Sequence, residues 1–300
     1  MSGTRQRRNS LSGPLADVAG DAGYAAHPER VGFFTDTSVC IGCKACEVAC
    51  KEWNGVPDTD EVLALTGMSY DNTGALGANS WRHVAFIEQP VPDSADPPES
   101  LIDLHADGDG GATRWLMASD VCKHCTHAAC LDVCPTGALV RTEFGTVIVQ
   151  PDVCNGCAYC VSACPFGVID RREDDGRAWK CTMCYDRLRG GLEPACAKAC
   201  PTDSIQFGPL DELRAIAQTR LEDLHAGGQV QARLYGEDPE DGIGGAGAFF
   251  LLLDKPEVYG LPPDPVVTTR DLPQMWRWAG AAAGMLAAGV VVAFAGRRPQ

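Results

Sequence analysis

Basic residues are scarce in this sequence, which has 25 Lys and Arg against 40 Asp and Glu in 300 residues and a formal charge of −15. Proteins that wrap nucleic acid neutralise its phosphates with cations, so this charge balance argues against a nucleic-acid partner. The sequence also offers no nucleophile–base pair, no open metal site and no phosphate-binding loop for substrate chemistry. With 45% hydrophobic and 22% charged residues, however, the chain is neither disordered nor fibrous.

Two short patterns lack the context that they need. Residues 242–247 match G-x-G-x-x-G, but a strand-like run at 249–253 follows, whereas a dinucleotide site needs a strand before and a helix after. Arg7 and Arg8 suggest a twin-arginine export signal, but no apolar segment follows them. Neither pattern is therefore assigned a function.

Cysteine, in contrast, is abundant. All 16 cysteines lie between residues 40 and 200, in four quartets with none left over. A chain of this length does not need disulfides to supplement its core, so the thiols require another explanation. The quartets are Cys40, Cys43, Cys46, Cys50; Cys122, Cys125, Cys130, Cys134; Cys154, Cys157, Cys160, Cys164; and Cys181, Cys184, Cys196, Cys200.

The spacing of the first and third quartets, C-x2-C-x2-C-x3-C, is that of bacterial ferredoxins, in which the fourth cysteine binds the other cluster of a pair. Four quartets therefore predict four 4Fe–4S clusters. Disulfides fit the even count, but cysteines two residues apart rarely form unstrained bridges. A structural zinc-binding scaffold remains an alternative from a different class, although zinc has no use for a third and fourth cysteine on each loop.

An internal repeat sets the pairing of the quartets. Its unit is a strand, a ligand loop, one helical turn, a proline and a second strand, and apolar runs at 31–34, 115–117 and 147–149 precede the loops. Only nineteen residues, with a hairpin at 139–149, separate the second and third quartets, so these pair as one compact module. The first and fourth quartets then pair with each other and enclose that module in sequence.

This crossing predicts four ligand sets, which are numbered here with their clusters. Set 1 is Cys40, Cys43, Cys46 with Cys200; set 2 is Cys181, Cys184, Cys196 with Cys50; set 3 is Cys122, Cys125, Cys130 with Cys164; and set 4 is Cys154, Cys157, Cys160 with Cys134. Lys44, Lys123 and Lys180 lie beside ligands and could offset cluster charge, although each is at least as compatible with an ordinary solvated lysine. His124 and His127 could modulate a neighbouring cluster or lie at an interface.

A C-terminal run predicts a membrane anchor. Residues 278–296 contain no charge and would span about 28 Å as a helix, with Trp276 and Trp278 at one end and Arg297 and Arg298 at the other. A buried alanine-rich helix is the alternative. The fold class is thus α+β, with two interleaved ferredoxin-like modules, each of two 4Fe–4S clusters, and one transmembrane helix.

The predicted organisation has six segments. They are a mobile N-terminal tail at 1–29; the first ferredoxin half with an insertion at 30–121, including a strand at 81–87; the inner ferredoxin module at 122–178; the second half, which closes the outer module, at 179–208; a packing helix at 210–225 and a pre-anchor segment within 209–269; and the transmembrane anchor with a short tail at 270–300.

With these quartets and the anchor, the chain closely resembles the iron–sulfur (beta) subunits of membrane-bound formate dehydrogenases, among the electron-transfer partners of molybdopterin oxidoreductases. The matching stretches are residues 37–46, 122–126, 180–187, 193–201 and 259–262. The resemblance implies a non-catalytic subunit that relays electrons from a molybdopterin (Mo or W) catalytic subunit to a membrane cytochrome b or quinone-reactive partner. It also implies that cluster 1 lies nearest the catalytic subunit and cluster 4 nearest the membrane haem.

The family further places the soluble part on the extracytoplasmic face of the cell membrane, with lipid around 278–296. Equivalent four-cluster subunits of membrane hydrogenases and of sulfur-compound reductases share the quartets, so they remain alternatives.

Overall fold

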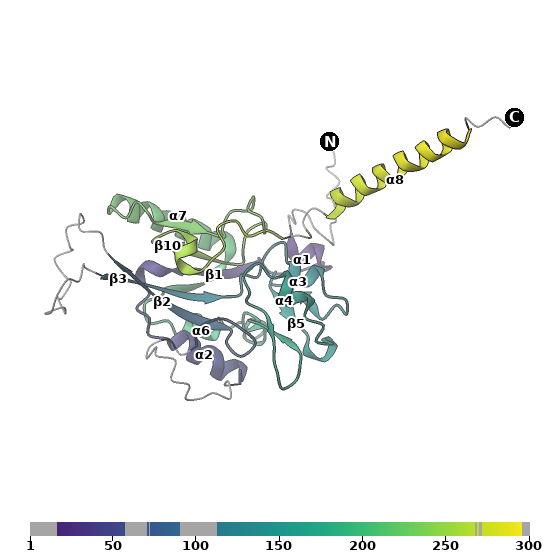
Figure 1. Cartoon of the computed structure of the whole chain (residues 1–300). Coiled ribbons are helices and arrows are strands. Elements are labelled where there is room, and N and C mark those ends of the chain that lie inside the picture. The colour runs from purple at the N-terminus through teal and green to yellow at the C-terminus, as the bar shows by residue number, and fades with distance from the viewer. Residues whose placement is uncertain are drawn as a thin grey trace.

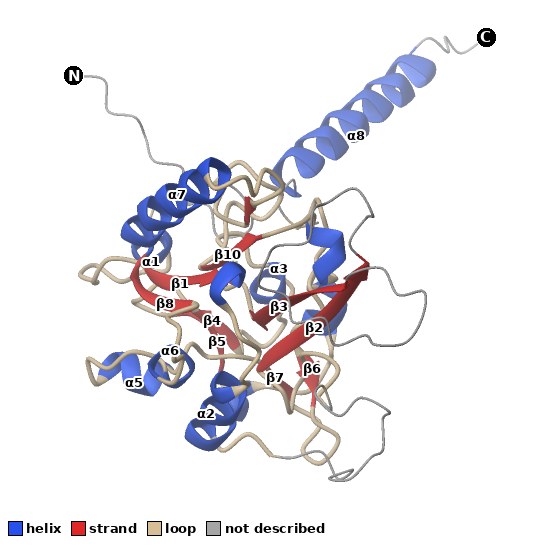
Figure 2. Ribbon diagram, turned by 90° about the vertical axis from the view of Figure 1, so that its left-hand side faces the viewer, coloured by secondary structure: helices blue, strands red, loops and turns tan. Residues whose placement is uncertain are grey.

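The strand before the first quartet is the centre of the main sheet. In the computed structural model, which describes residues 17–57, 71, 73–90, 113–267, 269 and 272–295, this strand is β1 (Val31–Asp36). It pairs antiparallel with β8 (Ile205–Pro209), which follows the fourth quartet, and parallel with β10 (Ala248–Leu252). The edge strand β9 (Arg233–Tyr235) completes the order β8-β1-β10-β9. The two distant ends of the cysteine region therefore lie side by side, as Figure 2 shows.

Short helices complete this outer module. The first quartet continues into α2 (Ala45–Asn54), which packs on α6 (Ala195–Lys198) of the fourth quartet. Helix α5 (Tyr185–Arg189) occupies the loop of the fourth quartet, and η1 (Thr37–Val39) links β1 to the first quartet. At ten residues, α2 exceeds the single turn that the repeat predicted, because its helix continues past the fourth cysteine until Gly55 adopts a left-handed conformation.

The inner module is contiguous in sequence. The predicted hairpin is confirmed as β4 (Leu139–Arg141) paired with β5 (Val147–Val149), and η2 (Pro151–Val153) leads into the third quartet. Helix α3 (Ala129–Asp132) packs on α4 (Tyr159–Ala163), and β6 (Asp170–Arg171) pairs with β7 (Ala178–Trp179). The alternating buried residues of β4 and β5 face the cysteines of this module.

A long two-stranded ribbon connects the modules. It pairs β2 (Arg82–Pro90), which extends the strand predicted at 81–87, with β3 (Thr113–Val121), which ends directly at Cys122. Figure 1 shows the ribbon between the main sheet and helices α2 and α6. The ribbon thereby brings side chains of the insertion into contact with the cysteines of the outer module.

Two segments flank the sheet. Helix α7 (Leu210–Ala226) confirms the packing helix predicted at 210–225, and its Leu210, Leu213 and Ala217 are buried in a cluster with Phe34. Helix α1 (Val18–Asp21) buries Val18, so the tail predicted through residue 29 is corrected for residues 17–29. The reason is that this segment has an apolar residue to bury and an Asp17 cap for the helix; residues 1–16 lie outside the described part.

The C-terminal segment ends in a single helix. After η3 (Pro256–Tyr259), α8 (Leu272–Ala295) projects away from the rest of the chain, as Figure 1 shows. Its stretch Gln274–Ala295 has a mean hydropathy of 1.9 in the most apolar window, and none of that window is buried within the chain. This helix is long and apolar enough to cross a membrane, and its exposure disfavours the alternative of a buried alanine-rich helix.

Candidate metal centres

The cysteine loops curl because specific residues adopt left-handed backbone conformations. In the first and third quartets these are Gly42 and Lys44, and Gly156 and Ala158, all with φ between 58 and 71°. In the second quartet His124, and in the fourth Met183 and Cys184, also have positive φ. Residues other than glycine rarely adopt this backbone conformation. It recurs just before the second cysteine of each quartet, where it bends the loop around its own cysteines.

Two of the predicted ligand sets line small cavities. Cys40, Cys43 and Cys46 face the same cavity as Cys200, although residue 200 belongs to the fourth quartet. The cysteines of set 3, from the second and third quartets, share another cavity. All sixteen cysteines are free thiols, so each cavity offers four sulfur ligands.

The other two sets are brought together in the same crossed manner. Cys50 is close enough to Cys181, Cys196 and Cys184 for their charges to interact, and Asn54 Nδ2 lies 3.7 Å from Cys50 Sγ and 3.6 Å from Cys184 Sγ. In set 4, Cys160 interacts with Cys154, Cys134 and Cys157. Each predicted fourth ligand thus lies beside the three cysteines of another quartet.

Four cysteine sulfurs around one cavity are the ligand set of a 4Fe–4S cluster. Zinc requires four ligands about a single ion, at about 2.3 Å for sulfur, whereas a 4Fe–4S cluster distributes four cysteines over four irons. The cysteine-lined cavities therefore fit a 4Fe–4S cluster.

Burial keeps Cys46, Cys130 and Cys160 protonated when no iron is bound. Loss of solvation raises the pKa of Cys46 to about 11, and with neighbouring thiolates it raises the pKa of Cys160 to about 11. Burial also raises the pKa of Cys130 to about 12 despite the opposing charge of Lys180. Because iron binds the thiolate form, cluster assembly must release protons from these residues.

Several donors point at the sulfurs. Ser119 Oγ lies 3.2 Å from Cys46 Sγ. The backbone N–H of Ala178 donates to Cys154 Sγ at 3.4 Å, and the backbone N–H of Met183 donates to Cys181 Sγ at 3.2 Å. Hydrogen bonds to the sulfurs are one of the features that set the reduction potential of an iron–sulfur cluster.

Arg82 is a site residue that the sequence analysis missed. Its side chain is fully buried, and its guanidinium donates to Cys196 Sγ at 3.3 Å and to the Ser119 carbonyl at 3.2 Å. Burial opposes its charge, but Cys196, Cys46 and Cys181, in their ionised form, outweigh this effect and raise the pKa of Arg82. Arg82 thus lies between sets 1 and 2. Its partners are 37 and 114 residues away, so no local pattern could reveal it.

The lysines beside the cysteines differ from one another. Lys44 is partly exposed and pairs with Glu47 and Asp71, whereas Lys123 and Lys180 are each only 1% exposed. The solvated alternative is therefore wrong for Lys123 and Lys180, because the loops fold over both side chains. Lys123 pairs with Asp120 and lies over the rings of Phe166 and Phe250.

Both histidines of the second quartet are buried. His124 Nδ1 accepts a hydrogen bond of 3.1 Å from the Val147 N–H, which attaches the quartet loop to β5. Burial, together with the nearby charge of Lys180, holds the pKa of His124 well below its ordinary value. Both His124 and His127 line the cavity of set 3 with its four cysteines. His127 is buried beside Gly244 in the glycine-rich segment.

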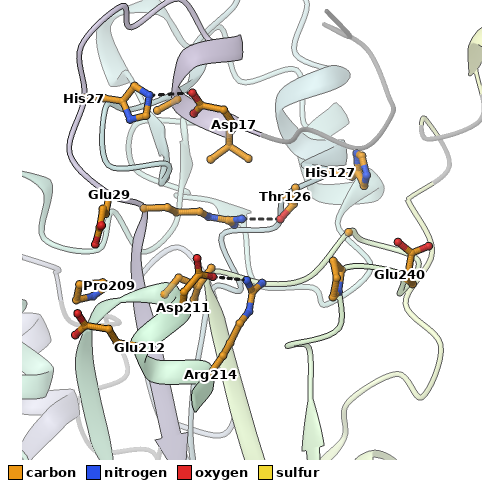
Figure 3. Close-up of a pocket in the computed structure, with 16 residues that line it drawn as sticks. Asp17, His27, Glu29, Thr126, His127, Pro209, Asp211, Glu212, Arg214 and Glu240 are labelled. Carbon is orange, nitrogen blue, oxygen red and sulfur yellow. Dashed lines mark hydrogen bonds and ion pairs between the residues drawn. The ribbon is translucent and has the colours of Figure 1, made fainter. Parts of the chain in front are cut away.

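A larger cavity of about 790 Å³ lies between α1 and the start of α7, beside Thr126 and His127 of the second quartet (Figure 3). Two ion pairs join its lining residues, His27 with Asp17 and Arg214 with Asp211, each at 3.0 Å, and Arg30 donates to Thr126 Oγ1 at 2.8 Å. No cysteine lines it. This cavity is therefore not assigned to a cluster.

Comparisons with known proteins agree with this chemistry. Two protein-family models, both described as 4Fe–4S dicluster domains, match residues 39–138 and 113–210 of the sequence. Over 271 residues, 89% of this chain and 83% of the relative, the sequence is 40% identical to the nitrate-inducible formate dehydrogenase iron–sulfur subunit of Escherichia coli K12. The formate dehydrogenase iron–sulfur subunit of Haemophilus influenzae is 39% identical over 80% of this chain and 71% of its own length. A subunit of the anaerobic dimethyl sulfoxide reductase of E. coli K12 is 37% identical over 62% of this chain and 76% of its own length.

Proposed function

We propose, from the premise that this chain belongs to the family of formate dehydrogenase iron–sulfur subunits, that it relays electrons through four 4Fe–4S clusters. It is an electron-transfer subunit and not a catalytic one. When bound, a 4Fe–4S cluster accepts and releases one electron at a time. The partners that we propose are a molybdopterin catalytic subunit, containing Mo or W, and a membrane cytochrome b or quinone-reactive subunit.

The observation that carries the proposal is a continuous series of sulfur neighbours. Sets 1 and 2 approach each other through Cys46 and Cys196, and sets 2 and 3 through Cys181 and Cys122. Sets 3 and 4 approach through Cys130 and Cys160. With each set as the ligands of one cluster, the four clusters follow one another in the order 1, 2, 3, 4.

Exposed ligands at the two ends of this series support two docking surfaces. Cys43 of set 1 and Cys157 of set 4 are the two exposed cysteines, and the other fourteen are partly or fully buried. Electrons can therefore enter and leave the series at its two ends. The catalytic subunit would contact the cluster 1 end, and the membrane subunit the cluster 4 end.

The attachment of the anchor supports this orientation. Thr269, three residues before α8, donates to Asp132 of α3 at 2.6 Å, so the inner module lies next to the start of the anchor.

We propose that the soluble part lies on the extracytoplasmic face. Protease added to intact spheroplasts should then digest it, whereas digestion only in inverted vesicles would place it in the cytoplasm.

The relay is tested on the complex purified without oxygen together with its partner subunits. We expect about sixteen irons and as many sulfides per chain, a brown colour that bleaches when formate is added, and recovery of the colour with a quinone. A colourless preparation, or one that contains zinc in place of iron, would refute the relay.

A role with a sulfur-compound reductase is a second candidate, favoured by the 37% identity to the dimethyl sulfoxide reductase subunit. In that case formate would leave the clusters oxidised, while dimethyl sulfoxide or a related oxide would reoxidise clusters that had been reduced chemically. The shorter stretch of similarity, 62% of this chain against 89%, favours the formate dehydrogenase role.

A further inference from the structure

We propose that Lys180 is a fixed positive charge between clusters 2 and 3 that makes both of them easier to reduce. The inference rests on the proposed function, because it requires the ligand sets given above. It attributes the raised reduction potentials of clusters 2 and 3, which lie in the middle of the relay, to one buried side chain.

Lys180 occupies the junction of the two modules. Its Nζ donates to the carbonyl of Val147 in β5 and to the carbonyl of Cys181 at 3.0 Å. The side chain also lines the cavity of set 3 with Cys122 and Cys130. The residue next to it in sequence, Cys181, belongs to set 2, so one ammonium group lies close to sulfurs of two different sets.

The charge of Lys180 has no carboxylate partner among the described residues, and this distinguishes it from the other lysines of the quartets. Lys123 is equally buried but pairs with Asp120, and Lys44 pairs with Glu47. The ammonium of Lys180 instead bonds to two carbonyl groups, with the sulfurs of the two sets as the nearest anionic groups. Its full charge therefore acts on whatever those sulfurs bind.

The effect on electron transfer follows from the charges. An oxidised 4Fe–4S cluster with four thiolates carries about −2, and uptake of one electron makes it about −3. A nearby cation in a medium that screens poorly stabilises the more negative state. When one electron leaves cluster 2 and enters cluster 3, the first is oxidised and the second reduced by one unit, and no bond or proton changes.

Because Lys180 lies near both sets, it lowers the energy of the electron on cluster 2 and on cluster 3. The step from cluster 1 to cluster 2 thus becomes more favourable, and the step from cluster 3 to cluster 4 less favourable. Lys180 lines the cavity of set 3, so loss of its charge should lower the potential of cluster 3 at least as much as that of cluster 2.

The test is a redox titration of the purified complex followed by EPR, with Lys180→Met and Lys180→Gln. At a fixed ambient potential, the ratio of reduced to oxidised cluster should fall by about tenfold or more for clusters 2 and 3, a shift of about 59 mV for each tenfold change. Clusters 1 and 4 in the same molecules should keep their potentials. Lys180→Arg, which keeps the charge, should retain most of the unmodified values.

A matched control removes the same charge where water screens it. Lys198 lies between Cys196 and Cys200 in sequence, but its side chain is 72% exposed, so Lys198→Met should leave all four potentials unchanged. Glutamine at 180 keeps a donor for the carbonyls, so it separates loss of charge from loss of folding if the methionine variant assembles poorly.

Variants with full iron content and unshifted potentials for clusters 2 and 3 would overturn the inference, as would equal shifts of all four clusters. Absence of iron from the unmodified complex would instead refute the proposed function itself.

Discussion

Replacement of Cys50 by alanine separates the crossed ligand sets from the simpler scheme in which each quartet binds its own cluster. Cys50 is buried on α2, where its sulfur neighbours are Cys181, Cys196 and Cys184 of the fourth quartet. Asn54 Nδ2 lies within 3.7 Å of both Cys50 Sγ and Cys184 Sγ. We therefore expect Cys50→Ala to change the EPR signal of one cluster, the one that Cys181→Ala also changes.

Double variants turn this expectation into a count. If Cys50 and Cys181 bind one cluster, Cys50→Ala/Cys181→Ala changes a single EPR signal and removes at most about four irons. If Cys50 and Cys43 bind different clusters, Cys50→Ala/Cys43→Ala changes two signals and removes up to about eight. The reverse result, two signals for the first pair and one for the second, would refute the crossed sets.

Three further results are expected. Arg82→Gln should make clusters 1 and 2 harder to reduce, by about tenfold or more in the ratio of reduced to oxidised cluster, because the charge beside their sulfurs is lost; unchanged potentials in an EPR titration would contradict this. Gly156→Ala should weaken retention of cluster 4, because the new Cβ would lie 2.3 Å from the Gly176 carbonyl oxygen. Iron analysis should show this loss, and it should show little loss for the control Gly137→Ala, whose position has a similar φ but no neighbour within 4 Å. The cluster-free protein should lose stability to urea as pH rises from about 9 to about 11, since burial raises the pKa of Cys46 from 9.0 to about 11 and the unfolded thiol ionises first; a gain of stability over that range would contradict it.

The cysteine loops could be predicted from sequence because iron ligation imposes a local spacing. The same holds for the hairpin at 139–149 and for α7, where turn residues and apolar periodicity lie within a short window. Counting quartets predicted that the first and fourth quartets pair, but it did not predict the pairing of β1 with β8, since no pattern within either strand specifies a partner so far away.

The charges around the cysteines could not be predicted. Arg82 lies in a ribbon outside the quartets, and only the fold brings it to Cys196. Lys123 and Lys180 are adjacent to cysteines in sequence, but lysine is usually solvated, so the sequence did not indicate that they are buried. Only the fold shows that the loops close over both side chains. Val18 was missed for a related reason, because a single buried residue in a Gly- and Ala-rich segment leaves no periodic signal.

The position of β1 at the centre of the main sheet has a consequence for biogenesis. At about 5–20 residues per second, a ribosome needs roughly ten to thirty seconds after making β1 to reach β8, and longer to reach β10. During that interval the contiguous segment 122–178 is synthesised whole, while both hydrogen-bonding edges of β1 stay unpaired. The main sheet is complete only after β10 has been synthesised and paired with β1. An arrest of translation before β10 should therefore leave β1 and the first quartet open to degradation.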